Sequence, residues 1–474
     1  MQAGLPKARG SASILMMLSL VLANLANLGI QFVIPRLLVP EEYTRFAMMW
    51  ASGQLVAALL FEWLRIGVVR YSANDAGDPR RLPETLAALY AALLVGASVL
   101  AVILLATGRT GSAMFMAGLI LFYACAQGAF DGQQANLRAR FLNVRFSVTW
   151  MVRSVLSFSL TLVVASAFSD GRFALAALSA SFLIVSLFAG LSPRSLRWPA
   201  RSSVVFLMKF GLFAAAAGII SFALPLVARY AMVHYAGGTD SAGAVLAVDI
   251  AQKILMALGT AVNLLLLQPV ISRVNRDPEE GSRYMESHLI NVVALFSAAM
   301  VVLLYANSVM VTYFVPPAFL ESYSKVSLLA VISIVLVCLK SYGLDALFAI
   351  GGKTVYSVVT SGVALLLVLL GCGGLYVTHS IGLSSTLVVL VLALVAGLVL
   401  ATYFAASVLS LRLPWGKLSR ILLVTAAAMV ASFLLAVYGN AVVQMAGFIV
   451  IAFIILGGYR ALGVGGPRQW LGQS

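Results

Sequence analysis

Charged residues are scarce in this 474-residue chain: Asp, Glu, Lys and Arg together make up 10% of it, and only 16 residues are acids. In a soluble globular protein these four residue types make up about 25% of the chain and keep its surface soluble in water. In their place the chain has 62% hydrophobic residues, more than a soluble fold of this length buries. The composition therefore excludes a cytosolic enzyme, a secreted disulfide scaffold and a disordered protein. It predicts an all-α polytopic membrane protein.

Residues that bind metals or form disulfides are equally few. The three cysteines all lie inside apolar stretches, and the three histidines are too far apart along the chain for a zinc motif. Gly352-Lys353-Thr354 resembles the end of a phosphate-binding loop, but Leu347 stands where the first glycine of that loop belongs. We therefore predict that the protein is not an enzyme and has no catalytic residue, metal site or cofactor. The net charge of +15 would suit nucleic acid, but in so apolar a chain basic residues serve membrane orientation, so we predict no nucleic-acid partner.

Long apolar runs dominate the sequence. A helix needs about 20 residues to cross the hydrocarbon core of a bilayer. The first run follows Lys7 and Arg9 and resembles a signal peptide, but it is longer than the apolar core of one, so we interpret it as an uncleaved first span. Fourteen runs stand between polar breaks, with connections too short for a soluble domain: 11–35, 47–69, 85–106, 112–130, 146–168, 173–190, 204–232, 243–271, 288–314, 325–349, 355–377, 383–410, 419–438 and 441–460.

Positive charges predict the orientation of these spans. If the N-terminus is cytoplasmic, 21 Lys and Arg residues fall in cytoplasmic segments, 5 on the opposite side and 5 inside spans. Cytoplasmic loops of membrane proteins carry this kind of excess of Lys and Arg. We therefore predict that both termini are cytoplasmic. The loops at 36–46, 233–242 and 315–324 are predicted outside, and those at 70–84, 191–203 and 272–287 inside.

Two similar segments indicate an internal repeat. The first predicted helix ends with Gln31-Phe32-Val33-Ile34-Pro35, and the seventh contains Ser221-Phe222-Ala223-Leu224-Pro225. Chance similarity between apolar helices is the alternative, yet the two copies stand six helices apart, so both helices enter the membrane from the same side. We predict two parallel six-helix bundles, at 1–203 and 204–411, followed at 412–474 by two extra helices and a cytoplasmic tail.

Three motifs carry a resemblance to a known family. Pro40-Glu41-Glu42-Tyr43-Thr44-Arg45-Phe46 is similar to a Pro/Gly-x-x-Tyr-Gly-x-Tyr/Phe pattern, with Thr44 in place of the usual glycine, and Gly67-Val68-Val69-Arg70-Tyr71 resembles a glycine and Arg-Tyr pair at a helix end. Gln127-Gly128-x-x-x-Gly132-Gln133-Gln134 resembles a Gln-Gly stretch before a basic turn, here made by Arg138, Arg140 and Arg145. In these motifs the chain resembles the polysaccharide-transport family (O-antigen or lipid-linked oligosaccharide flippases) of the MATE-like multidrug/oligosaccharidyl-lipid/polysaccharide exporter superfamily.

The resemblance implies a bacterial inner-membrane protein in which two six-helix bundles form a V around a cavity lined mainly by helices 1, 2, 7 and 8. It implies a flippase that moves polyprenyl-pyrophosphate-linked oligosaccharide across the lipid bilayer for cell-surface polysaccharide synthesis, alongside other polysaccharide-assembly membrane proteins. A cation-coupled multidrug antiporter of the same superfamily is the alternative, and it would need an uncompensated acid. A non-transporting component or an enzyme of glycan assembly is a more distant alternative, because the external loops are too short for a catalytic site.

Two acid–base pairs inside spans are the main candidate binding residues. Glu62 and Arg65 are three residues apart on the second helix, and Asp249 and Lys253 are four apart on the eighth, so each pair shares a helix face. Charges within a bilayer are costly and usually functional or paired. We predict that Arg65 and Lys253 bind an anionic head group, tuned by Glu62 and Asp249. The alternative is that each acid only neutralises its neighbour and helps to hold helices together.

Four further charges fall inside spans. Arg229 is a candidate substrate-binding residue, with an interfacial, snorkelling arginine as the alternative, and Arg153 is interpreted as snorkelling. Lys340 and Asp345 are five apart, about 140° round an α-helix, so they are predicted not to pair with each other. Asp345 would then lack a basic neighbour. The candidate ion-coupling acids are Glu62, Asp249 and Asp345.

Uncharged polar residues form a stripe on the first helix. Asn24, Asn27 and Gln31 follow an i, i+3, i+7 spacing, which places them on one face. Polar side chains in a membrane must face protein or water. They are therefore candidates for binding the sugars of a substrate, and interhelical hydrogen bonds are the alternative.

Overall fold

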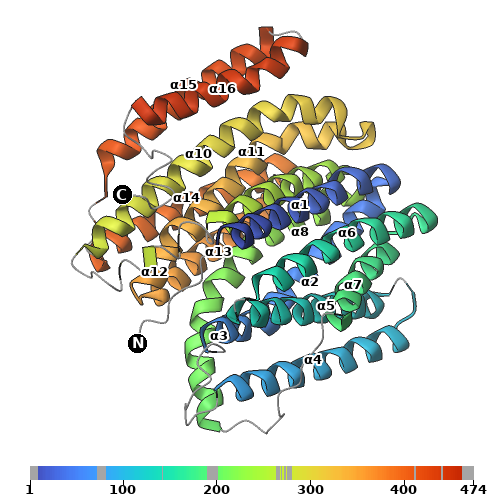
Figure 1. The fold of residues 1–474 in the computed structure, drawn as a ribbon. Coiled ribbons are helices and arrows are strands. Elements are labelled where there is room, and N and C mark those ends of the chain that lie inside the picture. Colours follow the sequence, from blue (N-terminus) through green and yellow to red (C-terminus); the bar gives the residue numbers. More distant parts are fainter. Residues whose placement is uncertain are drawn as a thin grey trace. The chain divides into compact units, whose positions relative to one another are not determined.

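The computed structural model describes residues 9–71, 82–110, 112–140, 142–188, 201–262, 280–409, 413–438 and 441–461, with isolated positions 267, 270–271, 274 and 411 (Figure 1). Every regular element in these residues is a helix, which confirms the predicted all-α class. The predicted tail after 461 and most of the predicted inner loops 70–84 and 191–203 lie outside the described residues. The chain divides into two compact units, Met1–Phe222 (unit 1) and Ala223–Ser474 (unit 2).

Unit 1 contains the first seven α-helices and the start of the eighth. The second α-helix, a short π-helix and the third α-helix follow one another without a break and form one apolar span, 40–68. The elements are α1 Arg9–Leu37, α2 Pro40–Ala57, π-helix η1 Ala58–Glu62, α3 Trp63–Tyr71, α4 Leu82–Thr107, α5 Ala113–Ala139, α6 Asn143–Phe168, α7 Gly171–Phe188 and the first part of α8 Arg201–Val262.

Unit 2 begins within α8. The backbone of α8 is broken at Gly237, whose φ of 81° is a conformation that glycine adopts readily and other residues avoid. The remaining elements are α10 Gly281–Tyr313, 3₁₀-helix η3 Pro317–Phe319, α11 Leu320–Cys338, π-helix η4 Leu339–Leu344, α12 Asp345–Ile350, α13 Thr354–Val377, α14 Leu383–Val408, α15 Trp415–Tyr438 and α16 Ala441–Ala461.

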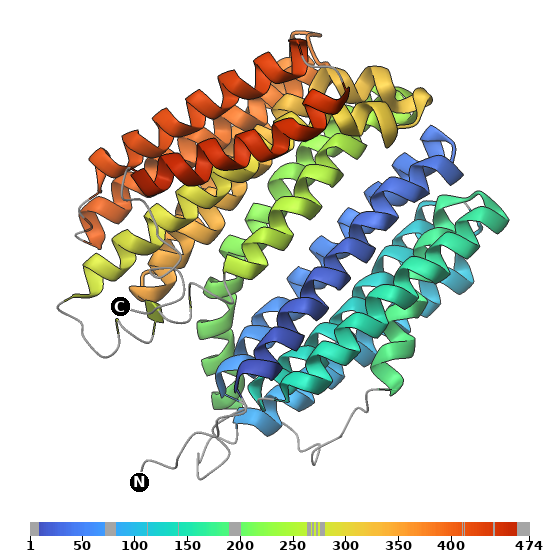
Figure 2. The same ribbon diagram turned by 45° about the horizontal axis from the view of Figure 1, so that its top comes forward.

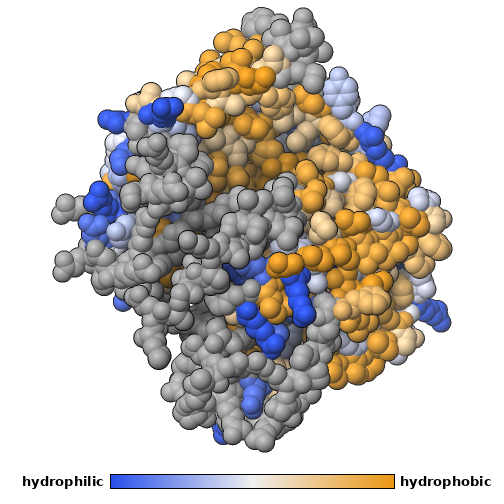
Figure 3. All heavy atoms as spheres, viewed as in Figure 1, coloured by the Kyte–Doolittle hydropathy of each residue, from blue (hydrophilic) through white to orange (hydrophobic). Residues whose placement is uncertain are grey.

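The helices are long and apolar enough for a membrane. Eleven candidate spans occur in the described residues, and α8 is counted among them as the single span Ala215–Val262, which includes its break at Gly237. Each of the fourteen predicted apolar runs overlaps a described helix. Apolar side chains cover large continuous areas of the visible surface, with hydrophilic ones confined to small areas (Figure 3). A helical protein that exposes so much apolar surface is a multi-pass membrane protein.

The predicted bounds of all three outer loops are wrong, because these segments are largely helical; the predicted loop 315–324, for example, contains η3 and the start of α11. The predicted loop 36–46 is helical except at Leu38 and Val39, because Pro40 takes the first position of α2, where its missing N–H costs nothing. Glu41 and Glu42 then stand in the first turn, where acids are favoured by the helix dipole. The predicted loop 233–242 is likewise helical apart from Gly237. The division into bundles at 203 stays a prediction, since α8 begins there and runs across the boundary between the compact units.

Helix α5 lies at the centre of unit 1, packed against α2, α3, α4 and α7. A side chain at Gly128 would collide with the ring of Phe61, and one at Gly132 would lie 2.5 Å from a ring carbon of Tyr90. The hydroxyl of Tyr90 donates a 2.5 Å hydrogen bond to the Gly128 carbonyl. The glycines of the Gln-Gly motif therefore serve close packing of three helices.

The last two helices pack on the rest of unit 2. Figure 2 shows α15 and α16 (red) side by side, and α15 lies against α10. Buried aromatic residues make the contact: the hydroxyl of Tyr459 donates a 3.0 Å hydrogen bond to the Ala294 carbonyl, and Tyr305 packs on Phe448 with ring centroids 4.8 Å apart. The hairpin is thus an integral part of unit 2.

Candidate functional site

The predicted Glu62–Arg65 pair is present in unit 1. The Nε of Arg65 donates to Oε2 of Glu62 at 2.6 Å, and its Nη2 makes a second contact with the other oxygen. Glu62 is the last residue of η1, and π-helical turns occur often at functional sites. The side chains of Arg65 and Glu62 are 39% and 28% exposed although they lie in an apolar span. Such a pair must face water or another polar group rather than lipid tails.

A second acid near this pair was missed by the sequence analysis. Asp131 on α5 accepts a 3.3 Å hydrogen bond from the Nε2 of Gln127. It lies within electrostatic range of Arg65 and Arg153, but among the described residues no cation comes within the 4 Å of a salt bridge. The available signal was an acid directly after the apolar run 112–130, between the two glycines of the Gln-Gly motif.

The snorkelling interpretation of Arg153 is wrong. Its side chain is buried, and its guanidinium carbon lies 4.6 Å from the ring centroid of Phe182, 5.4 Å from Phe130 and 5.8 Å from Trp150. Its Nη1 also donates to Oδ1 of Asn27 at 3.3 Å. The guanidinium therefore interacts with aromatic faces and an amide oxygen inside unit 1 and does not extend to the membrane–water interface.

The four charged side chains described above form a row of alternating charge within unit 1. Glu62, Arg65, Asp131 and Arg153 are negative, positive, negative and positive, and each interacts electrostatically with the next. The formal charges cancel, which lowers the cost of holding four ions in apolar surroundings. This row of charges runs from the exposed Glu62–Arg65 pair to the buried Arg153. An anion that reached Arg65 would therefore compete with Glu62 at the exposed end of the row.

The polar stripe of α1 is used mainly for helix contacts. Gln31 is buried and accepts a 3.3 Å hydrogen bond from the hydroxyl of Tyr43 on α2, while Asn27 accepts from Arg153 on α6. Interhelical bonding, the alternative to sugar binding, is therefore observed for these two residues. Asn24 is half-buried on the same face. The buried Nε2 of Gln31 has no partner in the described structure, so this residue keeps an unused donor.

In unit 2 the structure gives Asp249 a partner that the sequence did not predict. Arg229 and Asp249 form an ion pair of 2.8 Å, with side chains only 3% and 7% exposed, so the snorkelling alternative for Arg229 is wrong. The same Nη2 atom of Arg229 donates to Oε1 of Gln252 at 2.5 Å. Lys253, one turn beyond Asp249, is half-buried. The acid thus ties the two parts of α8 across the break at Gly237.

The prediction that Lys340 and Asp345 do not pair is also wrong. The Nζ of Lys340 lies 2.9 Å from both carboxylate oxygens of Asp345 and donates to Oγ of Ser361 at 2.5 Å. The four residues between them belong to η4, whose wider turn brings residues five apart onto one face. Asp345 therefore has a basic neighbour, and the reason for treating it as an uncompensated acid disappears.

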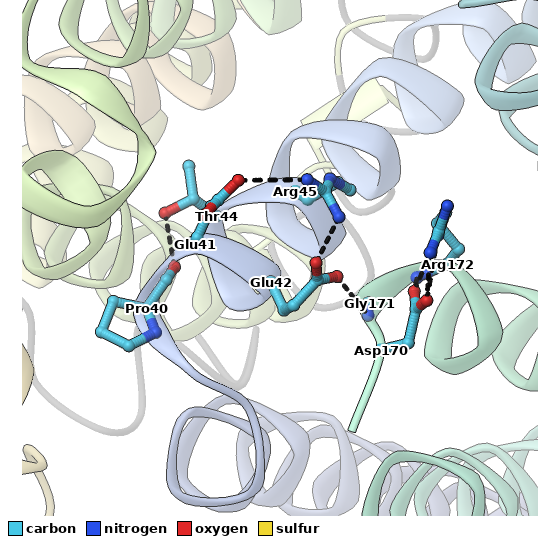
Figure 4. A network of polar contacts seen from close by, with 8 residues as sticks. All are labelled: Pro40, Glu41, Glu42, Thr44, Arg45, Asp170, Gly171 and Arg172. Atoms are coloured by element: carbon cyan, nitrogen blue, oxygen red, sulfur yellow. Dashed lines mark hydrogen bonds and ion pairs between the residues drawn. The ribbon is translucent and has the colours of Figure 1, made fainter. Parts of the chain in front are cut away.

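The Pro40–Phe46 motif ties α2 to the start of α7 (Figure 4). Oε2 of Glu42 accepts a 3.0 Å hydrogen bond from the backbone N–H of Gly171, and Glu42 also pairs with Arg45. Arg45 reaches Glu41 at 3.2 Å as well. A carboxylate at a helix N-terminus is favoured by the unpaired N–H groups there. These motif residues therefore hold two helices together.

Asp170 completes this network just before α7. Its Oδ1 accepts from the backbone N–H of Arg172 at 2.8 Å, and its Oδ2 lies 2.5 Å from the guanidinium Nη2. The hydrogen bonds from Arg172 hold the pKa of the Asp170 carboxyl below its ordinary value. Asp170 thus acts as an ionised cap on the helix.

No metal centre is apparent in the part of the chain that the structure describes. No group of three or more His, Cys, Asp or Glu side chains lies close enough there to hold a metal ion.

The same fold occurs in transporters of known structure. The chain matches lipid II flippase MurJ in an inward closed conformation with a TM-score of 0.67 and 11% identity, covering 96% of this chain and 98% of that one. It matches a multidrug resistance MATE family transporter of the MOP superfamily, inward-facing, with a TM-score of 0.60 and 16% identity over 84% and 98% of the two chains. An outward-facing conformation of a multidrug resistance MATE family transporter of the MOP superfamily matches with a TM-score of 0.59 and 15% identity, covering 84% of this chain and 94% of that one.

Identities this low establish a shared fold and nothing finer. No protein-family model matches the chain, and no curated protein matches it. The protein is a multi-pass helical membrane protein with the fold of MOP superfamily transporters.

Proposed function

We propose that the protein is a flippase that moves polyprenyl-pyrophosphate-linked oligosaccharide across the bacterial inner membrane for cell-surface polysaccharide synthesis. The observation that carries this proposal is the extent of the fold match. Residues 412–474, which contain α15 and α16, make up about an eighth of the chain. The match with the lipid II flippase covers 96% of the chain, so it has to include most of these residues. The 84% coverage with the multidrug transporter leaves room to omit the hairpin. A shared hairpin favours a lipid-linked substrate.

The exposed arginine of unit 1 supplies the chemistry that such a substrate needs. Pyrophosphate is an anion that cannot cross hydrocarbon alone, and a guanidinium binds phosphate oxygens bidentately. Arg65 is accessible within an apolar span, and Glu62 already binds it through two contacts. In this proposal Glu62 holds Arg65 in the empty state and gives way to the phosphate.

Unit 2 contributes a second cation in this proposal. Lys253 is half-buried, and the Arg229–Asp249 pair fixes the helix that carries it. Lys253 would bind the head group, while Arg229 and Asp249 would position it. Asn24 and the Nε2 of Gln31, which has no partner in the described structure, would contact the sugars. Glu62, Asp249 and Asp345 remain candidate coupling sites, although the last two are buried in ion pairs.

The orientation and setting follow from the proposed function. Both termini would face the cytoplasm, where lipid-linked precursors are made, as the distribution of Lys and Arg predicts. Other membrane proteins of polysaccharide assembly would supply and consume the substrate.

Reconstitution tests the proposal. The purified protein is reconstituted into liposomes that contain a fluorescent polyprenyl-pyrophosphate oligosaccharide, and a membrane-impermeant quencher is added outside. In protein-free liposomes the quencher reaches only the outer leaflet, so part of the fluorescence remains. An active flippase should bring the inner-leaflet fraction to the outside, so that more of the fluorescence is quenched. An Arg65→Ala preparation provides the matched control. If the wild-type protein leaves the inner-leaflet fraction protected while it transports organic cations, the flippase proposal fails.

A cation-coupled multidrug antiporter is the second candidate function, and Asp131 favours it. That activity needs an acid without a salt bridge, and within the described spans Asp131 has this property. Uptake of a fluorescent organic cation into proteoliposomes, driven by a proton or sodium gradient and lost in Asp131→Asn, would favour the antiporter over the flippase.

A further inference from the structure

A π-helical turn interrupts one long helix of unit 2. The helix runs from α11 through η4 into α12, and η4 spans Leu339–Leu344. Within it the Asp345 N–H bonds to the Lys340 carbonyl, five residues back. Such turns are rare because an α-helix of the same residues has better backbone geometry. Specific side-chain contacts therefore have to favour the wider turn.

The buried ion pair can form only in the π-helical register. In an α-helix, Lys340 and Asp345 would point about 140° apart. In η4, both carboxylate oxygens lie 2.9 Å from the Nζ of Lys340, whose side chain is 2% exposed. Ser361 of α13 accepts a further hydrogen bond from the same nitrogen. A return to the α-helical register would leave a buried ammonium without its carboxylate, which is strongly unfavourable.

The π-helical turn also places Tyr342 against α8. The Tyr342 ring stacks on Phe296 of α10, with centroids 5.9 Å apart and planes at 14°. Its hydroxyl donates to the Sδ of Met256 at 3.4 Å, and its ring fills the space that a side chain at Gly259 would occupy. His288 of α10 lies with its Nε2 3.0 Å from the Tyr342 carbonyl. Tyr342 is thus held at its ring, hydroxyl and backbone.

We infer that the Lys340–Asp345 ion pair is a register lock, which holds η4 in its π-helical turn so that Tyr342 braces the part of α8 that carries Asp249 and Lys253. Met256 lies one turn beyond Lys253, so the brace acts directly on the helix of the proposed head-group cation. Lys340 and Asp345 are then positioning residues, and this role in transport rests on the proposed function. The lock itself is a property of unit 2 and does not require a substrate.

A cross-link reports the register without using transport. The three native cysteines are first replaced by alanine, and Gly259→Cys and Tyr342→Cys are introduced for reaction with a short bifunctional thiol reagent. This pair should cross-link efficiently in the parent protein. The double variant Lys340→Met/Asp345→Leu, which removes both charges, should lower the cross-linking rate at least tenfold. The reversed pair Lys340→Asp/Asp345→Lys should restore most of it, because it can form the same bond in the same register.

Unit 2 offers a matched control on α11. Lys325 and Glu321 form an exposed pair of 2.7 Å in ordinary α-helical geometry, with side chains 57% and 85% exposed. Neutralising them by Lys325→Met/Glu321→Gln should leave the cross-linking rate unchanged. All variants are compared as monodisperse, detergent-purified protein. If the neutral Lys340/Asp345 variant cross-links as fast as the parent, the ion pair does not set the register and the inference is overturned.

Deleting one residue of η4 gives an independent test. A π-helical turn holds one residue more than the corresponding α-helix, so removal of Ser341 should produce a continuous α-helix with α12 in place. We expect a folded, membrane-inserted protein whose lipid-linked oligosaccharide transport falls at least tenfold. Normal transport by the folded deletion variant would contradict the positioning role. A wild-type protein without transport would count against the proposed function alone, since the cross-link would still decide the lock.

Discussion

Unit 1 and unit 2 both hold acid–base pairs inside apolar spans, but they bury them to different degrees. The side chains of the Glu62–Arg65 pair of unit 1 are 28% and 39% exposed, whereas those of the two buried pairs of unit 2, Arg229–Asp249 and Lys340–Asp345, are at most 12% exposed. An accessible pair can exchange its partner for a ligand. A buried pair cannot do so without leaving an uncompensated charge. We propose that the same residue types serve binding at the exposed pair of unit 1 and hold helices in position at the buried pairs of unit 2.

The largest effect should follow from breaking a buried pair in unit 2. Arg229→Ala removes one half of this buried ion pair, which we expect to cost about 3 kcal/mol of stability. Thermal melting of the detergent-purified protein, followed by size-exclusion chromatography, measures this loss. The double variant Arg229→Gln/Asp249→Asn should recover most of it. A single variant as stable as wild type would remove the contrast between the units.

The exposed pair of unit 1 should respond in activity rather than stability. Arg65→Ala should lower flipping of the lipid-linked oligosaccharide in proteoliposomes at least tenfold, about 1.4 kcal/mol of binding energy, with a nearly unchanged melting temperature. Arg65→Lys should recover part of the activity, since it keeps the charge and loses the bidentate geometry. Glu62→Gln should leave the fold intact and change only the rate. A destabilised Arg65→Ala protein would mean that this pair is structural too.

Asp131 sharpens the comparison because it lies between the exposed and the buried arginine of unit 1. Asp131→Asn should change stability by less than about 1 kcal/mol, because burial disfavours the charge of Asp131 while the nearby Arg65 and Arg153 favour it. For a flippase, the variant should keep measurable transport and respond to an ion gradient as wild type does. Loss of a gradient response that the wild type shows would instead support the antiporter.

The smallest effect is expected at the Asp170 cap. Hydrogen bonds from Arg172 lower the pKa of Asp170 in the folded state, so ionisation stabilises the fold. This contribution is present above the unfolded pKa of about 3.9 and is lost as the pH falls further. Asp170→Asn should therefore melt below wild type at pH 7, by no more than about 1 kcal/mol, and the gap should shrink steadily as the pH falls below about 3.9. A gap that stays constant over this acidic range would contradict this role.

The sequence predicted the helical class and the Glu62–Arg65 pair because both depend on local pattern. Apolar runs of spanning length require helices, and residues three apart on a helix meet. The sequence did not predict the Lys340–Asp345 pair, because a π-helical turn has no signature in apolar periodicity. Nor did it predict the Arg229–Asp249 pair, whose members are brought together only by the break at Gly237. Arg153 was misplaced because its partners come from other helices.

Thiol labelling tests the contrast between the units most directly. In a cysteine-free background, Arg65→Cys and Arg229→Cys are exposed to a hydrophilic, membrane-impermeant maleimide in detergent-purified, monodisperse protein, with and without the polyprenyl-pyrophosphate oligosaccharide. We predict that Arg65→Cys reacts readily and is slowed several-fold by the substrate, whereas Arg229→Cys stays unreactive until the protein is denatured. Equal labelling at the two positions, or labelling of Arg65→Cys that the substrate does not slow, would contradict the account.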